Sequence, residues 1–155
     1  MRIIALQGAA EKGKTSAIRR AYEIFKAQGI VEFFQFRENG DDIEAIIKLP
    51  DGRKVGFFSQ GDYSEDILHN IDTAKNGNCD ILATAVRTKG GTVNIISNYC
   101  YQNSDNEVLL LGVIDMYTDS NPSSSIYDNI NGNNCAAISS LSATHLLNVI
   151  QYVLS

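Results

Sequence analysis

A glycine-flanked stretch near the start of the sequence constrains the fold more than any other feature. Residues 8–15, Gly-Ala-Ala-Glu-Lys-Gly-Lys-Thr, have the spacing G-x-x-x-x-G-K-[ST] and follow the apolar residues 3–6. Residues 15–26 carry apolar side chains at helical spacing, which predicts an amphipathic helix. A loop that joins a strand to such a helix points several backbone N–H groups at one anion, and the helix dipole adds to their effect. The stretch therefore predicts a phosphate-binding loop.

Each residue type in this stretch has a physical reason for its place. Gly8 and Gly13 permit a backbone conformation and a close approach that a side chain would prevent. Lys14 is expected to reach the β- and γ-phosphate oxygens of a nucleotide, and Thr15 to offer its hydroxyl to Mg²⁺. The stretch predicts the following nucleotide-binding residues: Gly8, Ala9, Ala10, Glu11, Lys12, Gly13, Lys14 and Thr15.

On this motif and its context, residues 3–26 resemble the P-loop (Walker A) nucleoside triphosphatase superfamily. The resemblance implies that the chain binds Mg²⁺ together with ATP or another nucleoside triphosphate. It also implies that Ser16 contacts the α-phosphate. Small GTPases of this superfamily read guanine through N-K-x-D, and neither residues 87–90 nor residues 115–118 match that pattern. No subfamily is therefore assigned.

The resemblance further implies an acidic residue near the metal at the end of a strand. Asp62 follows the apolar residues 55–58, and its early place in the chain favours it. Asp115 is the alternative, because it follows the more apolar residues 111–114. Either aspartate can instead serve as an ordinary turn or cap residue.

A second anion-binding loop is predicted at residues 87–92, Arg-Thr-Lys-Gly-Gly-Thr. This loop lies between the apolar residues 79–86, which suit a buried strand, and the start of a helix. Backbone N–H groups and two cations at such a place bind phosphates. We expect Arg87 to stabilise charge on the γ-phosphoryl group during catalysis and Lys89 to bind phosphate. The alternative is a solvated basic turn.

The alternation of strand and helix patterns predicts one α/β domain over residues 1–155, a three-layer sandwich with a mostly parallel sheet. A hairpin is predicted for residues 43–49 and 54–58 around Pro-Asp-Gly-Arg, and it would add one antiparallel strand at the edge of the sheet. Ligands of such sheets bind beyond the carboxyl ends of the strands. Functional residues are therefore expected directly after strands.

Composition limits the partners and the compartment. The formal net charge of −5 argues against a nucleic-acid groove, which needs clustered Lys and Arg. No apolar stretch has the roughly 20 residues of a membrane span, and the first apolar run is too short for a secretory signal. Three widely spaced cysteines without a C-x-x-C pair predict free thiols, so we expect a cytoplasmic protein.

Two later segments widen the choice of function. Residues 118–135, rich in Asn and Ser, are expected to be a structureless surface loop and a candidate lid. Residues 140–154 predict a helix with more apolar positions than one stripe, so it is either buried or a homo-oligomer interface. Three functions remain open: hydrolysis of a nucleoside triphosphate, a small-molecule kinase whose lid is residues 118–135, and a non-catalytic switch that a partner protein reads.

Overall fold

The computed structural model describes residues 1–9, 13–38, 40–102, 107–113, 117–118, 121–125 and 132–155, with the described residues from 117 to 138 by their backbone alone. Its main sheet has six strands: β1 (Arg2–Gln7), β2 (Ile30–Phe36), β3 (Ile43–Lys48), β4 (Lys54–Phe58), β5 (Ile81–Val86) and β6 (Glu107–Gly112). Four described helices accompany it: α1 (Lys14–Lys26), α2 (Ser64–Asn76), α3 (Gly91–Gln102) and α5 (Gly132–Leu154). Two short strands form a separate sheet: β7 (Tyr117–Thr118) and β8 (Asn121–Ser125).

The main sheet is mixed, and its strands run in the order β2-β3-β4-β5-β1-β6. Strand β1 pairs in parallel with both β5 and β6, and β4 pairs in parallel with β5. Strand β3 is antiparallel to both of its neighbours, β2 and β4. The predicted α/β class and hairpin are confirmed. The prediction that the antiparallel strand lies at the edge is wrong, because β2 covers its other side.

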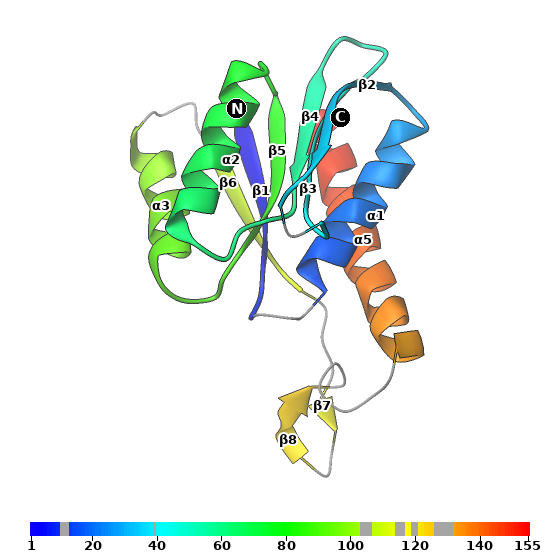
Figure 1. The fold of residues 1–155 in the computed structure, drawn as a ribbon, viewed down its shortest axis with the longest axis vertical. Coiled ribbons are helices and arrows are strands. Elements are labelled where there is room, and N and C mark those ends of the chain that lie inside the picture. Colours follow the sequence, from blue (N-terminus) through cyan, green and yellow to red (C-terminus); the bar gives the residue numbers. More distant parts are fainter. Residues whose placement is uncertain (10–12, 39, 103–106, 114–116, 119–120, 126–131) are drawn as a thin grey trace.

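Helices cover both faces of the sheet, an arrangement compatible with the expected three-layer sandwich. Figure 1 shows α1 and α5 on one face and α2 and α3 on the other. Because successive side chains of a strand point to opposite faces, β4 supplies both cores. Phe57 belongs to the core under α1 and α5, whereas its neighbour Phe58 belongs to the core under α2 and α3. Both side chains are fully buried.

Two segments differ from the sequence-based expectation. The apolar residues 108–114 predict a buried strand, but β6 pairs with β1 alone among the described strands and Leu110 is 47% exposed. The segment 118–135 is not structureless, because it contains β8 and the first residues of α5. Figure 1 shows β7 and β8 at the end of the molecule where β1 ends.

Helix α5 starts at residue 132 and is longer than the predicted 140–154. One side of it belongs to the core against α1, through Ala143, Leu146 and Ile150. Leu141 and Tyr152 are 51% and 80% exposed. No helix in the described part of the chain is long and apolar enough to cross a membrane.

The parallel strands β1, β4 and β5 end at one edge of the sheet, and the antiparallel β3 begins there. The loop after β4 lies against the end of β5 at this edge. A Cβ atom on Gly61 would lie 1.8 Å from the carbonyl oxygen of Ala85, so only glycine permits this approach. This edge therefore depends on close backbone packing.

Replacing Gly61 by alanine is expected to destabilise the protein by about 1–3 kcal/mol, because the added methyl group must push the loop away from β5. For a chain of this size that loss lowers Tm by about 2–4 °C per kcal/mol. Thermal unfolding measures the effect. The matched control is Gly112→Ala, where a Cβ atom has no neighbour within 4 Å. Equal Tm values for the two variants would contradict the close approach.

Candidate functional site

The predicted phosphate loop lies between β1 and α1, as the motif requires. Gly13 has the left-handed backbone conformation, with φ of 77°, directly before the first helical residue. The N–H of Gly8 donates to the carbonyl of Val86 at 3.1 Å, which ties the start of the loop to β5. A Cβ atom on Gly8 would lie 2.7 Å from the side chain of Val113. Ala10, Glu11 and Lys12 lie outside the described residues.

The ammonium group of Lys14 is buried beside this loop. The side chain is 7% exposed, and Nζ donates to the carbonyl oxygens of Gly8 at 3.0 Å and Ala9 at 2.5 Å. Burial lowers the pKa of Lys14 below its ordinary value of 10.5. The nearby Asp62 carboxylate opposes this shift and the Arg87 guanidinium adds to it. The site thus holds a desolvated positive charge, which binds anions strongly.

A cavity of about 300 Å³ opens at the start of α1, at the edge where β1, β4 and β5 end. Five residues predicted from the sequence line it, together with the loop after β4 and one residue before β3. The lining consists of Gly13, Lys14, Thr15, Ser16, Asp42, Ser59, Gln60, Gly61, Asp62 and Ala85. The structure therefore brings the phosphate-loop residues and a predicted metal aspartate to one cavity.

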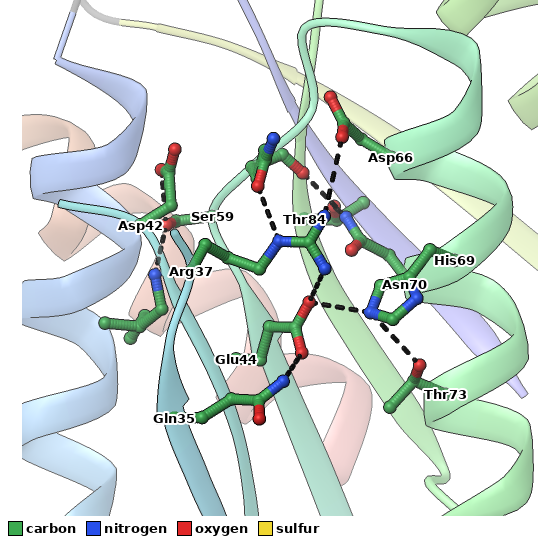
Figure 2. A network of polar contacts seen from close by, with 12 residues as sticks. Gln35, Arg37, Asp42, Glu44, Ser59, Asp66, His69, Asn70, Thr73 and Thr84 are labelled. Atoms are coloured by element: carbon green, nitrogen blue, oxygen red, sulfur yellow. Dashed lines mark hydrogen bonds and ion pairs between the residues drawn. The ribbon is translucent and has the colours of Figure 1, made fainter. Parts of the chain in front are cut away.

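Asp42 is a functional candidate that the sequence did not indicate. Its Oδ1 accepts a hydrogen bond from the hydroxyl of Thr15 at 2.8 Å and another from the hydroxyl of Ser59 at 2.7 Å. Ser59 Oγ in turn accepts from the N–H of Ile43 at 2.9 Å, and Figure 2 shows Asp42 and Ser59 side by side. Asp42 precedes the antiparallel β3, so a search restricted to residues after strands passes over it.

The other predicted site residues do not all lie at the cavity. Arg87 Nε lies 2.7 Å from Oδ1 of Asp62, so these two predicted site residues neutralise each other as a partly exposed ion pair. Lys89 is exposed in the same loop and is not part of the cavity lining. Asp115 lies outside the described residues. Of the two aspartates first considered, the structure places Asp62 at the cavity.

A network of polar side chains, centred on the buried Glu44, adjoins the cavity (Figure 2). Arg37 donates from Nε to Oε1 of Gln60 at 2.7 Å and from Nη1 to Oε1 of Glu44 at 2.8 Å. Glu44 is 1% exposed and also contacts His69, whose Nε2 lies 2.7 Å from Oε1. Asn70 donates to the backbone carbonyl of Gln60 at 2.7 Å. Both the side chain and the backbone of Gln60 are thus held by neighbours.

The donors in the cavity fit Mg²⁺ in the company of phosphates. Mg²⁺ binds through one or two carboxylates, with phosphate oxygens and waters completing an octahedron. Thr15 offers a hydroxyl, and Asp42 and Asp62 offer carboxylates that line the same cavity. Within the described ranges no three His, Cys, Asp or Glu side chains form a cage for a metal.

Lys14 offers a test by pH. The pKa of Lys14 is lower in the folded chain than the ordinary value of 10.5. Between the folded-state pKa and 10.5, the folded chain therefore binds fewer protons than the unfolded chain. The free energy of unfolding should therefore rise with pH in this window, relative to Lys14→Met, which has no amine. Denaturant titrations from about pH 8 upward measure this difference. A difference that is constant or falls with pH would contradict the lowered pKa.

Comparison with known proteins brings no family to this site. No protein-family model, no curated protein and no solved structure matches this chain. The resemblance to P-loop proteins rests on the motif at residues 8–15 and on its place between β1 and α1.

Proposed function

We propose that this chain is a P-loop nucleoside triphosphatase that binds a nucleoside triphosphate, ATP by preference, with Mg²⁺ and hydrolyses it. One observation carries the proposal: Lys14, Thr15 and Asp42 converge in a cavity at the start of α1. An ammonium group, a hydroxyl and a carboxylate are the groups that a Mg–triphosphate requires. The backbone of Gly13 before the helix supports this reading, because free N–H groups there favour an anion.

The roles of the residues follow from their chemistry. In hydrolysis the oxygen of a water attacks the γ-phosphorus, the bond to the β–γ bridging oxygen breaks, and a diphosphate, inorganic phosphate and one proton are released. Lys14 supplies positive charge to the β- and γ-phosphate oxygens. Thr15 and Asp42 would hold Mg²⁺, with Asp62 as the other carboxylate at hand. When bound, Mg²⁺ supplies charge neutralisation on the β- and γ-phosphates. Catalysis is then mainly positioning and electrostatics.

Arg87 can act on the phosphates only after a change of partner. Its guanidinium is paired with Asp62 at 2.7 Å, and both side chains are partly exposed. Exposed ion pairs contribute little, about 0–1 kcal/mol, so this pair separates easily. A triphosphate that brings more negative charge competes with Asp62 for Arg87. In this proposal Arg87 turns to the γ-phosphoryl group when the nucleotide binds.

Phosphate transfer to a small acceptor is a second candidate. A cavity of about 670 Å³, lined by Gln35, Phe36, Arg37, Glu38 and Gln60, adjoins the first and shares Gln60 with it. Strands β7 and β8 lie at the same end of the molecule, where a lid formed by residues 118–135 would act (Figure 1). A kinase needs such a lid because water otherwise takes the phosphoryl group. The third candidate, a nucleotide switch, requires binding without either product.

Replacing Lys14 by alanine is expected to weaken ATP binding roughly 10- to 100-fold, because charge-assisted hydrogen bonds to the phosphates are lost. Titration calorimetry with Mg–ATP measures the affinity. The matched control is Lys26→Ala, at the far end of the same helix. Unchanged affinity in Lys14→Ala would contradict the phosphate loop.

The products formed from Mg–ATP distinguish the candidate activities. Free phosphate without an acceptor identifies hydrolysis, and ADP that forms only with an added nucleoside or alcohol identifies a kinase.

The metal assignment predicts different effects for the two aspartates. Asp42→Asn is expected to remove most of the gain in ATP affinity that Mg²⁺ gives. The Asp42 carboxylate accepts a hydrogen bond from the Thr15 hydroxyl, so the two proposed metal-holding residues lie together. Asp62→Asn is expected to retain that gain and to bind the phosphates at least as tightly, because Arg87 loses its present partner. Calorimetry with Mg²⁺ and with a chelator measures both. The opposite pattern would give the metal to Asp62.

A further inference from the structure

The carboxamide of Gln60 has a fixed polarity. Its Oε1 accepts a hydrogen bond from Arg37 Nε at 2.7 Å. A carboxamide has one acceptor end and one donor end, and the two differ only by a rotation about the last side-chain bond. Arg37 has donors and no acceptor, so it can hold only the oxygen end of Gln60. The other end, the NH₂ group, therefore faces away from Arg37.

Arg37 is itself held in place by two carboxylates. Nη1 donates to Glu44 at 2.8 Å, and Nη2 lies 3.9 Å from the carboxylate of Asp66. Glu44, at 1% exposure, is fixed in turn by His69 at 2.7 Å and by Gln35, which donates to its second oxygen at 2.5 Å. Figure 2 shows Arg37 and Glu44 enclosed between these neighbours. A rotation of Gln60 would place two donors against each other, at the cost of a charge-assisted hydrogen bond.

The NH₂ group of Gln60 is available to a ligand. No hydrogen bond from it joins another described residue, and no side-chain nitrogen or oxygen in the described part of the chain is buried without a partner. The group is therefore accessible to solvent. Gln60 lines the cavity that also contains Lys14 and Thr15. Gln60 thus shares a cavity with the Lys14 ammonium.

We propose that Gln60 donates a hydrogen bond from its NH₂ group to the terminal phosphate of a nucleoside triphosphate, and that Arg37 is the positioning residue that turns this donor toward the cavity. The inference rests on the proposed function and adds to it a means of distinguishing triphosphate from diphosphate. A donor directed at the γ-phosphate has no partner on a diphosphate, so it favours the triphosphate alone. A Gln60 that used its oxygen to orient a water would first have to leave Arg37.

The test compares affinities for two probes, the non-hydrolysable β,γ-imido analogue of ATP and ADP, each with Mg²⁺. Gln60→Ala is expected to lower the ratio of the analogue affinity to the ADP affinity about tenfold, chiefly by weakening the binding of the analogue. A merely structural defect would weaken both probes alike and leave the ratio unchanged. The control Arg20→Gln, an exposed arginine on α1, should retain the wild-type ratio.

The positioning role of Arg37 needs a second variant, because removing Arg37 alone leaves the buried Glu44 carboxylate without its partner. The double variant Arg37→Met/Glu44→Gln removes both charges and frees the Gln60 oxygen. The double variant is expected to lower the ratio of analogue affinity to ADP affinity by much of the same factor as Gln60→Ala. A wild-type ratio in both Gln60→Ala and the double variant overturns the inference while nucleotide binding stands. Lack of any Lys14-dependent binding of either probe overturns the proposed function itself.

Discussion

The position of β1 inside the sheet is the constraint on which the rest of the molecule depends. It pairs in parallel on both sides, and Ile3, Ile4, Ala5 and Leu6 are fully buried. A strand enclosed in this way cannot shift without exposing apolar side chains on both faces. Its last residue therefore fixes where the loop to α1 begins. The pairing register then fixes the ends of β5 and β4 relative to β1. Loops from distant parts of the chain therefore meet at this end of the sheet.

Asp42 joins three elements at that edge through one oxygen atom. Thr15 belongs to α1, Ser59 follows β4, and Asp42 itself precedes β3. The antiparallel direction of β3 is what brings Asp42 there, because the start of β3 lies beside the ends of its neighbours β2 and β4, which run the other way. The hairpin between β3 and β4 thus has a role beyond extending the sheet. It supplies an acidic residue to a cavity whose other residues come from the parallel part of the fold.

Local patterns predicted the elements well, and long-range pairing explains the errors. The helical periodicity of residues 15–26 and the Pro-Asp-Gly turn each depend on neighbours in sequence, and the helix and the hairpin both form. Whether β3 is an edge strand depends on β2, and whether β6 is buried depends on a covering strand, so apolar composition could not settle either. Asp42 was missed for the same reason, since its place is set by the direction of β3. The Gln60–Arg37 contact depends on side-chain geometry that no pattern encodes.

The Lys14 ammonium donates to the carbonyls of the very loop that is expected to receive a phosphate. These loop carbonyls would thus compete with a phosphate for the Lys14 ammonium. An arriving phosphate exchanges one set of hydrogen bonds for another, and only the difference between the two sets contributes to affinity. In return, Gly8 and Ala9 have less conformational freedom to lose when a ligand binds, because their carbonyls are already held by a buried charge. In the proposed function, this exchange would favour highly charged anions over weakly charged ones.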